Sequence, residues 1–397
     1  MNWSLELKWW RQRVVNIWHF VRSLFWVIYN GYPARKLTVI GVTGTDGKTT
    51  TSTLIYEILQ AAGYKTGLIT TVNAKVGDEE LETGLHTTNP DAQHLQPILK
   101  KMVEKGVTHV VLEVTAHGLD QYRVLGCNFY IGVLTNISHE HLDDFVTMEN
   151  YARAKAKLFR NVRYAVVNRD DEYKDWILRA TQDDTKIIEY GKSEIKEVSE
   201  ALRGEYNRYN IGAALMVADV LGIKYQVSSI VVKNFKGVVG RREEVKSNKG
   251  FKVYVDFAHT PNGLKSILTQ LRTETKNKLI VVFGCTGERD QTKRPIMGKI
   301  VSEIADNVII TSDDTRHESQ DKIYDQIVSS IKYEVSSMKK VTKENDRKKA
   351  IEMAIKMAKN GDIVLLAGKG HEKSINLGGV EHPWSDVSTA RDIINHA

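Results

Sequence analysis

Residues 41–50 read Gly41-Val-Thr-Gly-Thr-Asp-Gly-Lys-Thr-Thr50, and they follow the apolar run Leu37-Thr-Val-Ile40. A helix-compatible segment, 50–59, continues from them. A strand, a glycine turn and a helix in this order surround a polyphosphate with backbone amides and a helix N-terminus. Lys48 is expected to reach the terminal phosphates, and the hydroxyl of Thr49 is expected to hold Mg2+. The sequence therefore predicts a phosphate-binding loop inside an α/β domain.

The glycine spacing of this loop is not that of the common phosphate-binding loop. The pattern is Gly-x-x-Gly-x-x-Gly-Lys-Thr, and Val42 stands where the common loop has a glycine. The loop is therefore a variant of its class. The residues that we expect to contact the nucleotide are Gly44, Thr45, Asp46, Gly47, Lys48, Thr49 and Thr50.

Size and composition favour a cytoplasmic enzyme of two or three domains. The chain has 397 residues, and 42% of them are hydrophobic, which is enough to fill the cores of that many domains. A net charge of +7 comes from 56 basic and 49 acidic residues, mostly dispersed, and this favours anionic small molecules over nucleic acid. Cys127 and Cys285 lie far apart in the sequence, so we expect two buried thiols and no disulfide framework or zinc ribbon.

The first 35 residues differ from the rest in composition. They hold five of the seven tryptophans among basic residues such as Arg13 and Arg22, and apolar residues recur at helical spacing over 7–28. No run reaches the roughly 18 apolar residues of a membrane span, and no cleavage site follows a positive leader. Two interpretations stay open. The helix packs against the next domain, or it touches an anionic membrane peripherally through residues 1–30.

From residue 36 onward, strand patterns alternate with helical ones, so we expect an α/β protein with mainly parallel sheets covered on both faces. The first series has expected strands at 37–42, 66–71, 108–114, 129–136, 163–167 and 186–189, with helices near 49–62, 91–105, 149–159 and 206–222. The second series has strands near 252–257, 278–283, 307–312 and 362–367, with helices near 262–274, 293–304, 320–332, 346–359 and 386–395. The expected domains are a short N-terminal amphipathic helix, 1–35, a central phosphate-loop domain, 36–236, and a C-terminal Rossmann-like domain, 237–397.

Polar residues follow two of the expected strands, at the edge where catalytic groups of parallel sheets gather. Glu113 is near the end of the strand 108–114 and is suited to Mg2+, because a hard cation prefers oxygen ligands. The strand 129–136 leads into a segment that contains His139, Glu140, His141, Asp143 and Asp144. The HExxH spacing of zinc hydrolases is missing, so one imidazole completing a magnesium site is the better interpretation.

Nine motifs, taken in chain order, resemble those of the Mur ligases, and especially the members that add the third residue of the peptidoglycan stem. The motifs lie at 41–50, 113–123, 135–143, 148–155, 202–214, 240–243, 255–261, 283–295 and 367–372. They include Glu113-Val-Thr-Ala-His-Gly118 and Val255-Asp-Phe-Ala-His-Thr-Pro261. The resemblance covers the chain from about residue 36 to its end.

This resemblance implies an ATP-dependent amide ligation. A substrate carboxylate takes the γ-phosphate of ATP, and the amine of an amino acid then opens the acyl phosphate. One lysine of the family is carbamylated by CO2, and the matching residue here is Lys155. The carbamate replaces a cation by an anion that can help to hold a second magnesium ion. The residues that the resemblance assigns to catalysis and to two magnesium ions are Lys48, Thr49, Glu113, His141 and Lys155.

Further positions match the family's nucleotide and acceptor contacts. On the nucleotide side they are Asn207, Asn210, Arg241 and Asp256. For a muramoyl-peptide-like acceptor they are Thr87, Thr88, Thr115, Gln121 and Arg123. Two residues depart from the family pattern here: Asn89 interrupts a Thr-Thr-Pro sequence, and Ala116 replaces a serine and so removes a hydrogen-bond donor.

A last set matches the family's site for the incoming amino acid. Its members are His259, Arg289, Asp313, Asp314, Arg316, Gly368 and Glu372. Arg316 is suited to the distal carboxylate of meso-diaminopimelate, whereas Asp314, which stands where the family has asparagine, would favour a distal ammonium group. Diaminopimelate, lysine and other diamines stay open. We favour diaminopimelate, because a guanidinium fork is the more specific feature.

The family's N-terminal UDP-binding domain has no counterpart in the resemblance, and the first 35 residues stand in its place. The acceptor is then either UDP-linked or a different carboxylate, as in folylpolyglutamate, cyanophycin, pseudomurein or lipid-linked peptidoglycan synthesis. A non-catalytic ATP-binding regulatory protein is the alternative from another class. It is disfavoured because Lys48, Glu113, His141, Lys155 and Arg289 occur together. A monomer is expected.

Overall fold

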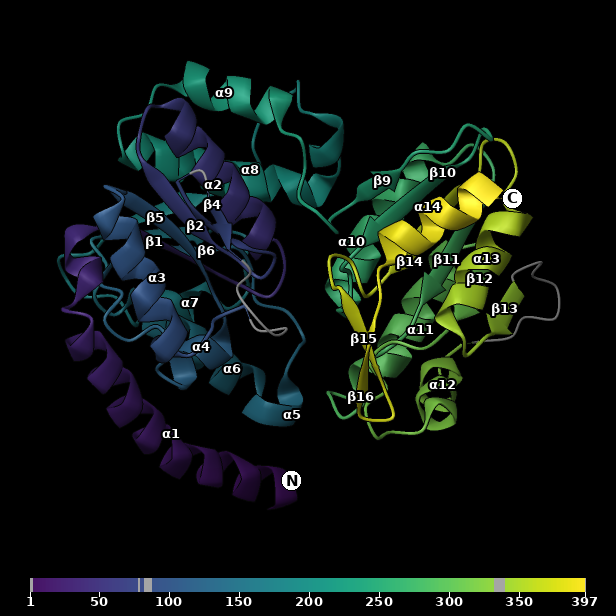
Figure 1. Ribbon diagram of the computed structural model, residues 1–397, viewed down its shortest axis with the longest axis horizontal. Coiled ribbons are helices and arrows are strands. Elements are labelled where there is room, and N and C mark those ends of the chain that lie inside the picture. The colour runs from purple at the N-terminus through teal and green to yellow at the C-terminus, as the bar shows by residue number, and fades with distance from the viewer. Residues whose placement is uncertain (1–2, 78, 82–87, 332–339, 397) are drawn as a thin grey trace. The chain divides into compact units, whose positions relative to one another are not determined.

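The computed structural model describes residues 3–77, 79–81, 88–331 and 340–396. The chain divides into two compact units, Met1–Lys236 and Gly237–Ala397. Each unit is built on a mainly parallel sheet with helices on both faces (Figure 1). The prediction of an α/β protein with mainly parallel sheets is therefore confirmed.

The sheet of the first unit has eight strands among the described residues, in the order β4-β3-β2-β5-β1-β6-β7-β8. All neighbours from β2 to β8 pair in parallel, while β3 and β4 form an antiparallel edge. The strands are β1 Thr38–Thr43, β2 Thr66–Ile69, β3 Ala74–Val76, β4 Glu79–Leu81, β5 His109–Val114, β6 Phe129–Leu134, β7 Tyr164–Asn168 and β8 Lys186–Tyr190. Parallel order brings the loops that follow β1, β2, β5, β6 and β7 to one edge of the sheet.

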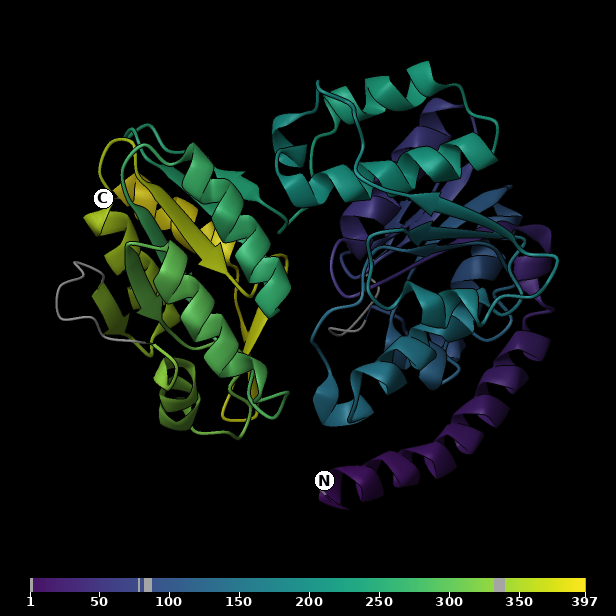
Figure 2. The same cartoon turned by 180° about the vertical axis from the view of Figure 1, so that it is seen from behind.

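Two layers of helices cover this sheet (Figures 1 and 2). One layer consists of α2 Lys48–Ala61, α8 Glu205–Val220 and α9 Tyr225–Asn234. The other layer contains α3 Ala92–Glu104, α4 Ala116–Asp120, α6 Met148–Ala156 and α7 Lys174–Leu178, with α1 Trp3–Tyr29 outside them. Short helical turns complete the unit: α5 Leu142–Phe145, η1 Pro33–Lys36, η2 Lys157–Phe159 and η3 Glu200–Leu202.

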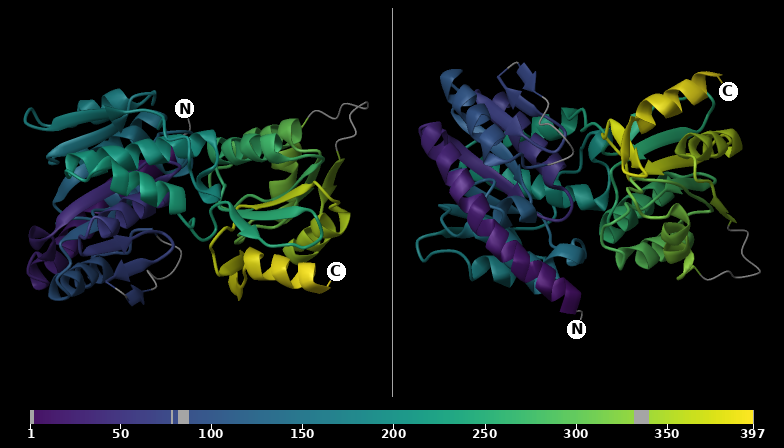
Figure 3. Two further views of the ribbon diagram at one scale, coloured as in Figure 1. Left: turned by 90° about the horizontal axis from the view of Figure 1, so that it is seen from above. Right: turned by 60° about the horizontal axis from the view of Figure 1, so that its bottom comes forward.

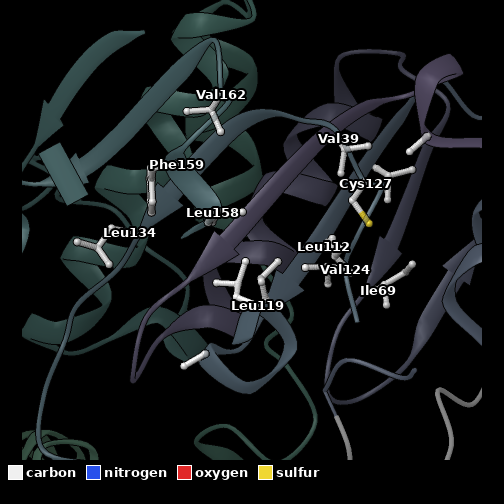
Figure 4. Close-up of a cluster of buried hydrophobic side chains, with 14 of the residues drawn as sticks. Val39, Ile69, Leu112, Leu119, Val124, Cys127, Leu134, Leu158, Phe159 and Val162 are labelled. Atoms are coloured by element: carbon white, nitrogen blue, oxygen red, sulfur yellow. The ribbon is translucent and has the colours of Figure 1, made fainter. Parts of the chain in front are cut away.

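One apolar core of the first unit lies between the sheet and the second of these layers. Figure 4 shows Val39, Ile69 and Leu112, from three neighbouring strands, beside Val124 and Cys127. The strands are almost continuously apolar because both of their faces are covered. Both cysteines are buried, as expected, and burial raises the pKa of the Cys127 thiol to about 12.

Helix α1 lies against the second layer (Figure 3, right). Asn16 donates a buried hydrogen bond of 2.9 Å to Asp120, and Arg22 forms an ion pair with Asp91. The Cβ atom of an alanine at 126 would lie 2.8 Å from Val27, so glycine at that position allows α1 to pack closely. Among the described residues, no helix is long and apolar enough to cross a membrane.

The sheet of the second unit has the order β13-β12-β11-β14-β10-β9, with β9 antiparallel at one edge. Its strands are β9 Glu243–Val245, β10 Lys252–Asp256, β11 Leu279–Phe283, β12 Asn307–Ile310, β13 Lys340–Lys343 and β14 Ile363–Ala367. Helices α10 Pro261–Glu274 and α11 Lys293–Ile304 lie on one face, and α13 Arg347–Met357 and α14 Asp386–His396 lie on the other (Figures 1 and 2). Helix α12 Gln320–Val328 and the hairpin β15 Ser374–Leu377 and β16 Val380–Pro383 complete the unit.

Several short elements were not predicted from the sequence, namely β3, β4, β9, β13, β15, β16, α4, α5, α7 and α9. Most are three to five residues long, too short for a periodic pattern to identify them. The ends of the longer predicted elements agree with the structure to within a few residues. For example, the strand expected at 129–136 ends at Leu134.

A buried ion pair in the second unit leads to a stability prediction. Arg347 and Asp386 are 1% and 0% exposed and make two hydrogen bonds, of 2.8 and 2.6 Å. Asp386→Ala would leave a buried guanidinium unpaired, and we expect the free energy of unfolding to fall by about 3–5 kcal/mol. Urea denaturation of the full chain, followed by circular dichroism, measures this loss.

The matched control is Glu352→Ala. It breaks the exposed pair Glu352–Lys356 and should change the free energy of unfolding by less than about 0.5 kcal/mol. Equal losses in the two variants would show that burial does not increase the contribution of the Arg347–Asp386 pair to the free energy of unfolding.

Candidate active site

The phosphate-binding loop joins β1 to α2 and contains two glycines that its neighbours require. Gly44 and Gly47 have φ angles of 154° and 80°. A Cβ atom on Gly44 would lie 1.8 Å from the hydroxyl of Thr135, and one on Gly47 would lie 2.2 Å from the amide oxygen of Asn210. Helix α2 begins at Lys48, so its first-turn amides belong to the loop.

Residues that follow β6 form hydrogen bonds with the phosphate-binding loop. Thr135 donates a hydrogen bond of 2.7 Å to the carbonyl of Asp46, and Asn136 donates one of 3.0 Å to the same oxygen. The amide of Asp46 donates in turn to the side chain of Asn136 at 3.0 Å. The ammonium group of Lys48 donates to the carbonyl of Thr45 at 2.8 Å, so this lysine lies along the loop.

Thr49 and Glu113 lie together at the carboxyl ends of β1 and β5. Parallel pairing places Val42 opposite Glu113, and the hydroxyl of Thr49 donates to the Glu113 carboxylate at 3.0 Å. The carboxylate also accepts hydrogen bonds from the amide and the hydroxyl of Thr71, at 3.1 and 3.0 Å. Glu113 is 1% exposed and has no cationic partner among the described residues. A buried carboxylate beside a hydroxyl, without a cation of its own, fits a divalent ion.

Asn89, which departs from the family pattern, connects several neighbouring segments by hydrogen bonds. It is 1% exposed, and its side chain donates to the carbonyl of Glu113 at 2.7 Å. Its side-chain oxygen accepts from the amide and the hydroxyl of Thr115, at 2.8 and 2.9 Å, and its carbonyl accepts from Arg123 at 3.0 Å. The hydroxyls of Thr88 and Thr71 lie 2.8 Å apart, so Thr88 joins the Glu113 cluster through Thr71.

Lys155 is buried near the same loop. It is 1% exposed, and its nitrogen donates to the carbonyl of Gly44 at 2.6 Å and lies 4.4 Å from the centre of the Tyr151 ring. Burial, followed by the charge of Lys48, holds the pKa of Lys155 well below its usual value. A lowered pKa makes the neutral, nucleophilic form of this amine easier to reach.

His141 contacts the same tyrosine. Its ring centre lies 5.9 Å from that of Tyr151 and 4.8 Å from that of His117. His117 in turn makes a 3.0 Å contact with the carboxylate of Asp144. Among the described residues, no three His, Cys, Asp or Glu side chains are grouped closely enough to hold a metal ion by themselves. A metal at the loop would need Thr49, phosphate oxygens or a modified Lys155 as further ligands.

Asn207 and Asn210, on α8, support the loop from its other side. The side chain of Asn210 donates to Asn207 at 2.8 Å and accepts from Thr51 at 3.2 Å. Both asparagines are almost fully buried. Their contacts fix Gly47 and the first turn of α2.

In the second unit, residues expected near the nucleotide, Arg241 and Asp256, and one expected near the amino acid, His259, surround Phe257. The guanidinium carbon of Arg241 lies 4.4 Å from the Phe257 ring centre, and a ring nitrogen of His259 lies 2.8 Å from the Phe257 carbonyl. Asp256 accepts hydrogen bonds from the amides of Arg242 and Ala258, at 2.7 and 2.8 Å. Asp256 thereby fixes the turn that follows β10.

Lys369 is the residue of the second unit that the sequence analysis missed. It is fully buried, and its ammonium group lies 2.7 Å from Asp314 and 2.5 Å from Glu372. The nearby charges of Asp313, Glu372 and Asp314 raise its pKa against the opposing effect of burial. The negative charge of Asp314, expected to attract a substrate ammonium group, is thus already paired with Lys369. The signal was available, because Lys369 lies in the motif 367–372 at the end of β14.

Arg316 differs from Lys369 in its charged surroundings. Its backbone has a φ angle of 52° and its amide donates to the carbonyl of Asn376 at 3.2 Å. Within the described residues, its guanidinium has no hydrogen-bond or ion-pair partner, and the side chain is only partly exposed. An arginine held in this way fits a carboxylate supplied by a ligand.

Gly368 has a φ angle of 108°, and a Cβ atom there would lie 2.6 Å from the carboxylate of Asp313. Arg289 is exposed.

In the first unit, Gln121 has a buried side-chain oxygen without a partner among the described residues, and Thr87 lies outside those residues. The sequence analysis did not assign Thr71, Thr135, Asn136 or Tyr151, which the structure adds to the loop and its surroundings.

A phosphate loop, a hydroxyl–carboxylate pair fit for a divalent ion and a second α/β unit are typical of a nucleotide-dependent α/β enzyme. Two family models match the chain: the Mur ligase middle domain over residues 42–228, and the Mur ligase glutamate ligase domain over residues 240–370. The chain belongs to the Mur ligase family, and it is an enzyme that forms amide bonds with ATP.

Relatives and solved structures agree with this assignment. A relative from Bacillus cereus, UDP-N-acetylmuramoyl-L-alanyl-D-glutamate--2,6-diaminopimelate ligase, is 38% identical, with 92% of this chain and 80% of the relative covered. A solved structure of a ligase with the same name is 33% identical, with a TM-score of 0.60 over 91% of this chain and 78% of that chain. Mycobacterium tuberculosis folylpolyglutamate synthase complexed with ADP is 16% identical, with a TM-score of 0.70 over 88% of this chain and 91% of that chain, and it shows the same fold.

Proposed function

We propose that this ligase joins meso-diaminopimelate to the carboxylate of a muramoyl-dipeptide-like acceptor, in the synthesis of a peptidoglycan precursor. The observation that carries the proposal is the Thr49–Glu113 contact of 3.0 Å beside the phosphate loop. The names of relatives 36–40% identical to the chain support the choice of substrates. The monomeric state and the membrane contact of residues 1–30 stay predictions.

ATP binds along the loop, with its phosphates at the first-turn amides of α2. Lys48 turns from the Thr45 carbonyl to the terminal phosphates and neutralises their charge as the acceptor carboxylate attacks. Phosphoryl transfer depends mainly on such positioning and neutralisation. Asn207 and Asn210 hold the loop on the adenine side. Arg241 and Asp256, which belong to the second unit, are the further residues that we assign to the nucleotide.

Thr49, Glu113, His141 and a carbamylated Lys155 would hold two magnesium ions, which would supply positive charge to the phosphates when bound. The buried Glu113 carboxylate, which has no cation among the described residues, supports this assignment. Lys155 itself is modified when its neutral amine adds to CO2. A nitrogen–carbon bond forms, one proton is released, and an anion replaces the amine.

The acceptor lies beside Thr87, Thr88, Thr115, Gln121 and Arg123. Asn89 does not contact the acceptor in this proposal. It orients Thr115 and Arg123 through the hydrogen bonds described above. The unpartnered oxygen of Gln121 then accepts a hydrogen bond from the acceptor peptide.

The incoming amino acid lies in the second unit, at His259, Arg289, Asp313, Asp314, Arg316, Gly368 and Glu372. Arg316 clasps its distal carboxylate, because the guanidinium has no partner among the described residues. Lys369 neutralises Asp314, so that residue exerts little attraction on a distal ammonium group. Both features favour diaminopimelate over lysine.

The experiment that tests the function is a screen of amino acids for stimulated ADP release. The full chain is supplied with ATP, Mg2+ and UDP-muramoyl-dipeptide, and the product is identified by mass. We expect diaminopimelate to give the largest stimulation and Lys48→Ala to lower turnover by about 100-fold or more. Lys100→Ala, which removes an exposed lysine from α3, is the control and should be unchanged. Normal turnover in Lys48→Ala with an unchanged melting curve would refute the nucleotide assignment.

A second prediction concerns the carbamate at Lys155. Lys155→Ala should bind ATP but lose the magnesium-dependent turnover, and a short carboxylate in the buffer should restore part of it. Carbon-13 spectra in labelled CO2 should show a carbamate signal that is missing in this variant. Lys186→Ala, at an exposed lysine of β8, should keep both the signal and the activity. Full activity of Lys155→Ala without CO2 would return this residue to a structural role.

A third prediction concerns the choice of amino acid. Arg316→Ala should raise the Michaelis constant for diaminopimelate by the equivalent of ~2 to 4 kcal/mol, since a carboxylate loses its charged partner, and should affect lysine less. Arg391→Ala, at an exposed arginine of the same unit, should change neither constant. When both amino acids compete in the wild-type enzyme, a product that carries lysine alone would show the preference for diaminopimelate to be wrong.

A further inference from the structure

Helix α1 turns a largely polar side towards the protein. Asn16, Ser23 and Val27 are 5%, 2% and 1% exposed, and their spacing places them on one face. Asn16 donates its buried hydrogen bond to Asp120 on this face. The apolar contacts of this side include Val27 against Gly126, and Phe20, whose ring centre lies 5.2 Å from that of Tyr122.

The opposite side of α1 is apolar and faces solvent. Its residues recur every three or four positions, and each is more than half exposed: Val14, Ile17, Trp18, Val21, Phe25 and Ile28. We call these six residues the outer face of α1. The usual arrangement, with the apolar side inward, is thus reversed. A continuous exposed apolar stripe of this kind marks a surface that another phase or molecule covers.

A basic groove lies beside the helix. It has a volume of about 490 Å3, and its charged lining residues are Arg13, Asp120, Arg153, Lys157, Arg160 and Arg179. Asp120, the one acidic side chain of the lining, is paired with Lys157 at 2.6 Å and with Arg13 at 3.7 Å. Five cationic side chains around one carboxylate leave the groove positive, so it suits an anion such as a phosphate group.

The groove and the outer face of α1 are continuous. Arg13 lines the groove and lies one helical turn before Ile17, so the two residues share a side of α1. In Figure 3 (right), α1 runs lengthwise along the surface of its unit. An apolar stripe with tryptophan and phenylalanine, next to a cluster of arginine and lysine, matches the boundary between acyl chains and anionic headgroups.

We propose that the outer face of α1 and the basic groove together hold this ligase on an anionic lipid bilayer. Helix α1 lies in the plane of the interface with Trp18 and Phe25 among the acyl chains. The groove takes lipid phosphate groups. Charge complementarity selects the bilayer over a protein partner, because an apolar protein surface would leave the cations of the groove unmatched.

The test is flotation of the full chain with vesicles of phosphatidylcholine alone or mixed with phosphatidylglycerol. We expect the chain to float with the mixed vesicles, and raised salt should weaken this binding because the groove contribution is screened. Flotation requires neither ATP nor an acceptor, so its outcome does not depend on the proposed reaction.

Two pairs of variants separate the components of the surface. Trp18→Gln with Phe25→Gln should lower binding by tenfold or more, because two large apolar side chains no longer enter the bilayer. Arg160→Gln with Arg179→Gln should lower binding to the mixed vesicles by about 30-fold, since each cation near such a surface contributes about 1 kcal/mol. All four positions are exposed, so the melting curves should not change.

The matched controls remove similar groups elsewhere in the same unit. Tyr225→Gln with Ile230→Gln removes two exposed apolar side chains of α9, and Lys224→Gln with Lys236→Gln removes two exposed cations. Both controls should float like the wild type. The proposal is overturned if the outer-face variants float equally well, or if the wild type is a dimer in light scattering that these variants convert to a monomer. Groove variants that lose binding of inorganic phosphate but keep vesicle binding would equally overturn it.

Discussion

The arrangement of the first unit depends on the parallel pairing of β1 with β5. This register sets Val42 opposite Glu113, so the strand that enters the phosphate loop runs beside the strand that carries the buried carboxylate. Everything that follows at this edge, from the Thr49 hydroxyl to Thr71 and Asn89, is attached to that pair of strands by hydrogen bonds. A shift of one residue would turn Glu113 to the opposite face of the sheet and separate its carboxylate from the Thr49 hydroxyl.

In the second unit, two cationic side chains differ in whether carboxylates of the protein neutralise them. Lys369 is buried among carboxylates that compensate it, whereas Arg316 has no such compensation among the described residues. The first arrangement is complete within the protein, and it shapes the loop after β12 before any substrate is present. The second leaves a guanidinium able to pair with a carboxylate from outside the protein, which is the role that we propose for Arg316.

The sequence was sufficient to predict the alternation of strands and helices and most residues of the loop, because periodicity and glycine spacing are local signals. It could not predict the order of the strands, and this explains why Thr71 was missed: it reaches Glu113 only because β2 lies beside β5. Asn89 was recognised as a departure, but its hydrogen bonds to Thr115 and Arg123 join segments more than 25 residues apart in the chain. The pairing of Lys369 with Asp314 spans 55 residues and was hidden for the same reason.

The glycines of the phosphate loop have one more consequence. Side chains of the protein itself, Thr135 and Asn210, occupy the space where a Cβ atom at Gly44 or Gly47 would lie. The loop is therefore preorganised: folding, and not the nucleotide, fixes its backbone, and little conformational entropy is left to lose when phosphates arrive. The glycine pattern that identifies a nucleotide site in this sequence is thus required because residues of α8 and residues that follow β6 pack closely against the loop.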